Sequence, residues 1–178
     1  MSLKSTLSVF VFIVIGIAGY SEIKAQDSDT AISIEAHRID DSALSIDGNL
    51  NEEFWQKAHI ATNFKQMQPF DGQPASEKTE VRVLYSDHYL YVGFKAYDSS
   101  PDSITASLFR RDGNEASDWV YVNIDSYNDN RTAFTFAANP LGVQKDIMYF
   151  NDTQEDVLWD AVWEVQSRII EDGWECEF

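Results

Sequence analysis

Three tryptophans are the side chains best suited to bind a ligand in this chain. Trp119 follows Asp118 at the start of an alternating run, Trp159 lies in a loop-like stretch at residues 156–160, and Trp163 begins the next run. An indole ring stacks on the apolar face of a ligand, and nearby polar groups fix the ligand's orientation. Trp119 is a stacking platform if its face of the sheet is open, and a structural residue if another layer covers it.

A compact basic spot lies just before Trp119 in an otherwise acidic chain. Arg110 and Arg111 are followed directly by Asp112 and Gly113. Two guanidinium groups could clamp a carboxylate or hydroxyl groups of a ligand. The alternative is that both arginines form ion pairs with neighbouring aspartates. The predicted ligand-binding set is Trp119, Trp159, Trp163, Asp118, Arg110 and Arg111.

Oxygen-bearing side chains gather at residues 125–130. Asp125, Asn128 and Asp129 could ligate Ca²⁺, which prefers hard oxygen ligands. The spacing does not match the twelve-residue calcium loop, which needs a central glycine and a closing glutamate. The alternative is a turn in which these side chains accept hydrogen bonds from their own backbone.

No catalytic residues are predicted. His37, His59 and His88 are far apart in the sequence, without metal-ligand spacing. The single cysteine, Cys176, lies in an apolar strand pattern with no activating neighbour. Whether two of the 30 acidic side chains form a catalytic pair depends on a separation in space.

The elements that position these residues read as strands. The run from residue 79 to 100 alternates apolar and polar residues on both sides of a short connector at 86–88, the pattern of a β-hairpin. Its predicted inward residues are Val81, Val83, Tyr85, Leu90, Val92, Phe94 and Ala96. Further short runs, evenly spaced, predict an antiparallel β-sandwich or barrel. The predicted strands cover residues 31–36, 63–68, 81–85, 89–98, 104–110, 119–125, 133–138, 143–149, 162–169 and 174–178.

One short helix is expected at residues 50–58. Asn49 or Asn51 would cap its first turn, and two glutamates there suit the positive end of the helix dipole. Phe54, Trp55 and Ala58 would share a face, which indicates packing against a sheet. Trp55 is therefore predicted to be a core anchor.

The N-terminus predicts export. Residues 1–25 contain an early cation, an apolar run of roughly a dozen residues and a small residue at Ala25, the pattern of a secretory signal peptide rather than of a membrane-spanning helix. An uncleaved anchor is the alternative. Residues 26–38 would form a linker and the first strand, and residues 39–178 the sandwich. The formal net charge of −17 argues against nucleic-acid binding.

Several segments together resemble a known family. They are IDGNL at 46–50 with EFW at 53–55, EVRVLYSDHYLYVGFKAYD at 80–98, SDWVYVNID at 117–125 and DGW at 172–174. This ordered set resembles carbohydrate-binding module family 9, an antiparallel β-sandwich. The run NDNRTAFTFAANPLGVQ at 128–144 is similar to a subgroup found at the N-terminus of large bacterial envelope proteins, whose C-terminal domain of unknown function is expected to be an outer-membrane barrel.

The resemblance implies secretion, possible sugar binding and, in some members, calcium as a structural partner. Sugar-binding members place a stacking tryptophan a few residues before the acidic residue that opens the central strand, here Asp118, but residues 111–117 contain no aromatic side chain. They also place an arginine in the next strand, where this chain has Thr135 and Ala137. The fold therefore transfers better than the sugar site.

We therefore expect a non-catalytic carbohydrate-binding module of a larger exported bacterial protein. It would be periplasmic, secreted or attached to the outer membrane, and linked to carbohydrate catabolism by O-glycosyl hydrolysis elsewhere in the full-length protein. Its partners would be a saccharide and a downstream domain, since the apolar alternation at 174–178 ends in mid-strand. The alternative is a structural or interaction domain of an outer-membrane protein that kept the fold and lost sugar binding.

Overall fold

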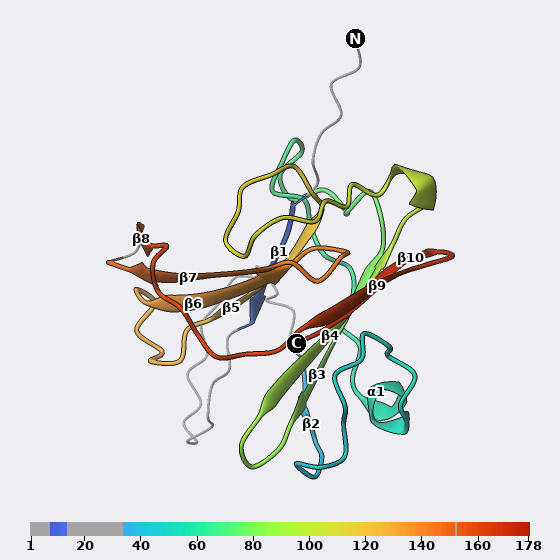
Figure 1. Cartoon of the computed structure of the whole chain (residues 1–178), viewed down its shortest axis with the longest axis horizontal. Helices are drawn as coiled ribbons and strands as arrows, with labels where there is room; N and C mark the ends of the chain where they lie inside the picture. Colours follow the sequence, from blue (N-terminus) through green and yellow to red (C-terminus); the bar gives the residue numbers. More distant parts are fainter. Residues whose placement is uncertain (1–7, 14–33, 152) are drawn as a thin grey trace, which may run out of the picture.

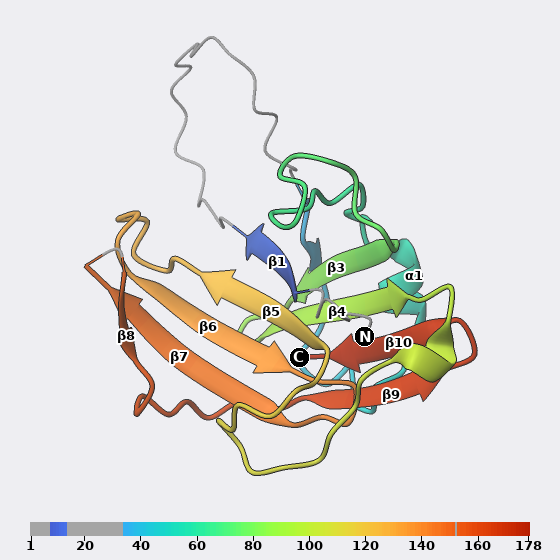
Figure 2. The ribbon, with the colours of Figure 1, turned by 90° about the horizontal axis from the view of Figure 1, so that it is seen from above.

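Two five-stranded sheets pack face to face in a computed structural model that describes residues 8–13, 34–151 and 153–178 (Figure 1). Sheet A has the order β1-β5-β6-β7-β8, and sheet B has the order β2-β3-β4-β10-β9 (Figure 2). The pairing is antiparallel except where β1 meets β5 and β2 meets β3. The predicted fold class, an antiparallel β-sandwich with one short helix, is confirmed.

The strands of sheet A are β1 (Ser8–Ile13), β5 (Trp119–Ile124), β6 (Ala133–Ala138), β7 (Gln144–Phe150) and β8 (Gln154–Asp156). Those of sheet B are β2 (His37–Arg38), β3 (Thr79–Tyr85), β4 (Leu90–Tyr97), β9 (Gln166–Ile170) and β10 (Gly173–Glu177).

The predicted hairpin is present as β3 and β4. Val83 pairs with Val92 and Val81 with Phe94, so these four side chains project from the same face of sheet B. They are buried, with exposed fractions of 2% or less. The prediction was wrong at the hairpin tip, where Tyr85 and Leu90 are 41% and 36% exposed. This pair lies at the end of both strands, just before the turn.

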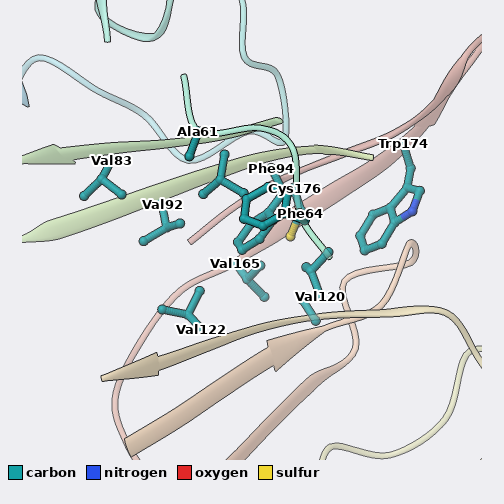
Figure 3. Close-up of a cluster of buried hydrophobic side chains, with 12 residues drawn as sticks. Ala61, Phe64, Val83, Val92, Phe94, Val120, Val122, Val165, Trp174 and Cys176 are labelled. Atoms are coloured by element: carbon teal, nitrogen blue, oxygen red, sulfur yellow. The ribbon is translucent and has the colours of Figure 1, made fainter. Parts of the chain in front are cut away.

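The core lies between the hairpin and β5. Val120 and Val122 project from sheet A toward Val83, Val92 and Phe94 of sheet B (Figure 3). The hairpin is therefore opposed by β5 across the sandwich. Trp174 and Cys176 of β10 complete this core, and both are buried.

Three predicted strands are not strands, and three observed strands, β1, β2 and β8, were not predicted. Residues 34–36 are not in a strand, and 31–33 lie outside the described residues. Residues 63–68 make only an isolated bridge, Lys65 to Pro74, and Asn63 has a left-handed backbone with φ of 63°. Residues 104–110 are held by local hydrogen bonds around Thr105 rather than by a ladder. The missed β8 is a polar edge strand of three residues, which has no apolar alternation to predict it.

An outer layer covers the second face of sheet B. Helix α1 (Glu53–Lys57) lies on that face (Figure 1), and Trp55 is fully buried. Gly93 of β4 makes room for this layer, because a Cβ atom there would lie 2.7 Å from the Leu50 side chain. The Trp55 prediction is confirmed. The N-cap prediction was wrong, since Glu52 is the N-cap and makes no side-chain capping bond.

The N-terminal strand β1 falls inside the predicted signal sequence. It pairs in parallel with β5, Ser8 opposite Trp119 and Ile13 opposite Ile124. Cleavage of residues 1–25 stays a prediction, and the cleavage position lies outside the described residues. No helix within the described part of the chain is long and apolar enough to span a membrane.

Candidate functional site

A continuous line of aromatic side chains lies against the inner face of sheet A and reaches the end of β10 in sheet B. We define the aromatic strip as Phe134, Phe136, Trp159, Trp163 and Phe178. Trp159 contacts Phe134 at a centroid separation of 5.0 Å and Phe136 at 5.9 Å. Trp163 meets Phe136 edge to face at 5.3 Å and stacks on Phe178 with an interplanar angle of 4°. Phe178 in turn touches Phe94, so the aromatic strip leads from the core toward the β7–β8 end of the sheet.

Register explains why two members of the strip face inward. Phe136 is opposite Val122, and Phe134 is opposite Ile124, so both share the face of the core valines. The segment that follows β8 then folds back over this face and brings Trp159 and Trp163 against the two phenylalanines. Both tryptophans are half-buried. The indole N–H of Trp163 is buried and has no hydrogen-bond acceptor among the described residues.

Arg111 fastens this segment to sheet A. Its guanidinium donates to the Asp146 carboxylate at 2.6 and 3.0 Å and to the Ala161 carbonyl at 3.0 Å, and it lies 2.8 Å from Asp160. The Asp146 side chain is 0% exposed and also accepts the Ala161 N–H at 2.6 Å. Burial lowers the pKa of Arg111, but the Asp146 hydrogen bond and surrounding carboxylates outweigh it and raise that pKa. Arg111 thus matches the ion-pair alternative.

Trp119 lies on the opposite, outer face of sheet A. It is 7% exposed and packs against Phe109 and Tyr121. The Lys145 ammonium lies 4.7 Å from the centre of its ring, and burial lowers the pKa of Lys145. Little of the Trp119 ring is therefore open to a ligand, which matches the covered alternative.

Asp118 and Arg110 do not join the aromatic strip through any contact in the described structure. Asp118 exchanges two hydrogen bonds with Thr105: its carboxylate accepts the Thr105 N–H at 2.9 Å, and its own N–H donates to the Thr105 carbonyl at 2.8 Å. Burial raises the pKa of Asp118. Arg110 is exposed, and its carbonyl accepts the Gly113 N–H in a turn.

The predicted calcium loop uses its oxygens internally. Asp125 accepts the N–H groups of Asp129 and Asn130, and Asp129 accepts those of Arg131 and Thr132. The latter hydrogen bonds lower the pKa of Asp129. Asn128 has a left-handed backbone, with φ of 52°. These contacts match the turn alternative.

A different carboxylate cluster was missed by sequence reasoning. Oxygens of Asp47, Glu52 and Glu177 lie within 4.8 Å of one another. Glu177 is 0% exposed, and its two oxygens already accept the N–H groups of Asp47 and Gly48 and the Trp55 indole N–H, all at 2.7–2.8 Å. Calcium takes six to eight oxygen ligands, so a residue whose oxygens are satisfied by N–H donors fits it poorly. The cluster instead joins the outer layer to β10.

A cleft of about 430 Å³ lies elsewhere, between residues 62–65 and 74–79. Phe64 and Pro74 supply apolar walls, and Lys65, Glu77 and Lys78 supply charges. None of the predicted site residues lines it.

Comparisons with known proteins match this architecture. Residues 46–170 match the model of the carbohydrate family 9 binding domain-like family. The fold is similar to that of a solved carbohydrate binding module family 9 from Caldicellulosiruptor kristjanssonii in complex with cellotriose, with a TM-score of 0.50 and 16% sequence identity. The similarity covers 80% of this chain and 65% of that one, so this chain spans less than two thirds of its length. A comparison with curated protein sequences found no match. Since the family model covers most of the chain, the protein belongs to the carbohydrate family 9 binding domain-like family.

Proposed function

We propose that this chain is a non-catalytic carbohydrate-binding module and that a sugar ring stacks on Trp159 of the aromatic strip. The observation that carries the proposal is the placement of Trp159: it is half-buried, fixed by Phe134 and Phe136, and next in sequence to Asp160, whose side chain is 75% exposed. A rigidly held indole beside hydrogen-bonding groups is what recognition of a pyranose face requires. Family membership and the neighbour bound to cellotriose support the same ligand class.

The Trp163 indole supports a bound hydroxyl nearby. A buried donor without an acceptor is costly, and a ligand oxygen or an ordered water would remove that cost. Arg111 acts as the positioning residue in this proposal, because it ties Asp160 and the Ala161 carbonyl to β7 through Asp146.

The wider context of the function is also a proposal. The apolar N-terminal run supports export to the periplasm, the outer membrane or the medium of a bacterium. In such a setting the module would hold a larger exported protein near its glycan, and any O-glycosyl hydrolysis would be carried out by another part of that protein. The proposal assigns calcium no site, because Asp125 and Asp129 accept hydrogen bonds from the backbone of their own loop.

The proposal is tested by titrating cellohexaose and other oligosaccharides into the purified protein, using calorimetry together with tryptophan fluorescence. We expect binding that is lost in Trp159→Ala. The matched control is Trp119→Phe, on the other face of sheet A, which should bind normally. Binding that survives Trp159→Ala and is lost in Trp119→Phe would place the ligand on the outer face and refute the site. No binding of any oligosaccharide, with or without calcium, would refute the function.

A second function, as a protein-interaction domain, is favoured by one observation. Val157, Leu158 and Val162 are 55%, 90% and 106% exposed in the segment that carries Trp159. Exposed apolar side chains clustered in one segment are typical of protein contact surfaces. Under this alternative, the unmodified protein would capture a protein partner and bind no oligosaccharide. Leu158→Ser would abolish capture of that partner.

A further inference from the structure

We infer that the glycan recognised at the aromatic strip carries free amino groups, as in oligomers of glucosamine, rather than carboxylates. This inference rests on the proposed function, because it names the class of sugar for the same site. Its basis is the negative charge around Trp159 and the fact that the nearby cation, Arg111, is already paired with Asp146 and Asp160.

Three carboxylates belong to this part of the molecule. Asp160 adjoins Trp159, and its side chain is 75% exposed. Asp156 is opposite Met148, which is opposite Phe134, so Asp156 projects from the same face of sheet A as the aromatic strip. Asp146 is opposite Phe136 and therefore shares that face.

The cation at the site is not available to an acidic ligand. The Arg111 guanidinium lies 2.6 Å from Asp146 and 2.8 Å from Asp160. Three carboxylates against one guanidinium give a formal local charge of 1 − 3 = −2. Lys145 is on the opposite face of the sheet over Trp119, and the charge of Arg131 acts on the Asp129 carboxylate, whose pKa it helps to lower after the Arg131 and Thr132 backbone hydrogen bonds. A uronic acid would therefore meet net repulsion, within a chain whose formal charge is −17.

An amino sugar suits each of these features. Its ring can stack on the indole, and its ammonium group can interact with the aromatic face, with the exposed Asp160 carboxylate and with the partly buried Asp156 carboxylate. Recognition of an ammonium by an aromatic ring beside carboxylates needs no cation from the protein. Both Asp156 and Asp160 lie within four residues of Trp159 in sequence.

The test compares oligomers of one length that differ mainly in charge: a glucosamine hexamer, its N-acetylated counterpart, cellohexaose and a galacturonic acid hexamer. At about pH 5.5 most of the glucosamine amines are protonated. We expect the glucosamine hexamer to bind about tenfold more tightly than the N-acetylated one at low salt, and the difference to shrink at high salt. The galacturonic acid hexamer should bind most weakly.

Two substitutions connect the preference to the site. Asp156→Asn keeps an oxygen that can accept the Leu158 N–H, so the local turn survives. It should weaken binding of the glucosamine hexamer about threefold to fivefold, a larger loss than for cellohexaose. Glu53→Gln, the same charge change on α1, is the control and should alter neither. Equal or tighter binding of the N-acetylated or galacturonic acid hexamer would overturn the inference while keeping the proposed function. Failure of all four oligomers to bind would refute the proposed function itself.

Discussion

Trp55 and Trp159 occupy opposite kinds of environment in the same sandwich. Trp55, on the outer face of sheet B, is 0% exposed, and its indole N–H donates to Glu177 at 2.7 Å. Trp159, on the inner face of sheet A, is half-buried and held by two phenylalanine rings. A tryptophan whose ring is buried and whose N–H is hydrogen-bonded stabilises the fold. A tryptophan that is only partly buried can still contact a ligand.

Two buried carboxylates, Glu177 in the region of Trp55 and Asp146 in the region of Trp159, also differ in what they hold together. Glu177 is satisfied by N–H donors that come from a turn and from α1, so it closes an internal joint. Asp146 is satisfied by Arg111 and by the Ala161 N–H, which belongs to the segment that carries Trp159. One carboxylate therefore stabilises the outer layer, and the other positions the candidate site.

The largest effect is expected at Trp55. Trp55→Ala should lower the free energy of unfolding by about 3–5 kcal/mol, because it removes a fully buried ring and leaves Glu177 without its indole donor. Denaturant unfolding monitored by circular dichroism measures this loss. Trp55→Phe should cost less, since it restores part of the ring. A loss below about 1 kcal/mol in Trp55→Ala would contradict the assignment of Trp55 as an anchor.

Arg111→Ala should have the next largest effect on stability, about 2–4 kcal/mol. The Asp146 carboxylate would lose its guanidinium and keep the Ala161 N–H as a donor within the 0%-exposed site. The neighbouring Arg110→Ala is the control and should change stability by less than about 0.5 kcal/mol. Equal losses in both variants, measured by denaturant unfolding, would show that the Asp146 ion pair does not fasten the segment.

Trp159→Ala should cost only about 1–2 kcal/mol of stability, because the ring is already partly solvated. It should nevertheless abolish oligosaccharide binding. Measuring unfolding and calorimetric binding on the same preparation separates the two effects. A stability loss as large as that of Trp55→Ala would remove the contrast between the two tryptophans.

The smallest effect is a pH dependence at Glu52. Burial raises the pKa of Glu52, and so does the nearby Asp47. A carboxyl whose pKa is raised by folding loses stability as the pH rises from the ordinary glutamate value through the raised one. Glu52→Gln should therefore leave the thermal midpoint unchanged near about pH 4 and raise it slightly near about pH 8.

Glu53→Gln gives the opposite control for Glu52. The Lys57 hydrogen bond lowers the pKa of Glu53, so its contribution is present above the ordinary glutamate pKa and is lost as the pH falls. Removing this carboxylate should lower the thermal midpoint slightly near neutral pH. If both variants shift the midpoint in the same direction, the burial of Glu52 does not govern its effect.

The alternation of apolar and polar residues predicted the regular strands correctly, but it was not a sufficient guide elsewhere in the chain. The β3–β4 hairpin and β6 were predicted because a buried face forces every second residue to be apolar. Segment 104–110 alternates in a similar way, yet its backbone is satisfied through Thr105 and through the Asn139 side chain, which donates to the Ser107 carbonyl. β8 has no apolar face to read.

The candidate site was predicted only in its components. Trp159, Trp163 and Arg111 were identified by residue type, and the structure brings them to one side of sheet A, whereas Trp119 lies on the other face. The hydrogen bonds that Glu177 accepts from Asp47, Gly48 and Trp55 could not be predicted, because a glutamate in a strand is normally expected to face solvent. Its burial depends on a turn that lies about 130 residues earlier in the chain.

The order of residues alone was sufficient to predict the strands with an alternating pattern, the anchoring role of Trp55 and the acidic character of the chain. Those properties depend on local periodicity and composition, which are present in the residues as written. Three features depend instead on long-range packing: Trp119 is covered, Asp146 holds Arg111, and Trp159 folds back onto Phe134. The last two of these contacts join residues 35 and 25 positions apart, and no short-range pattern specifies which distant partners will meet.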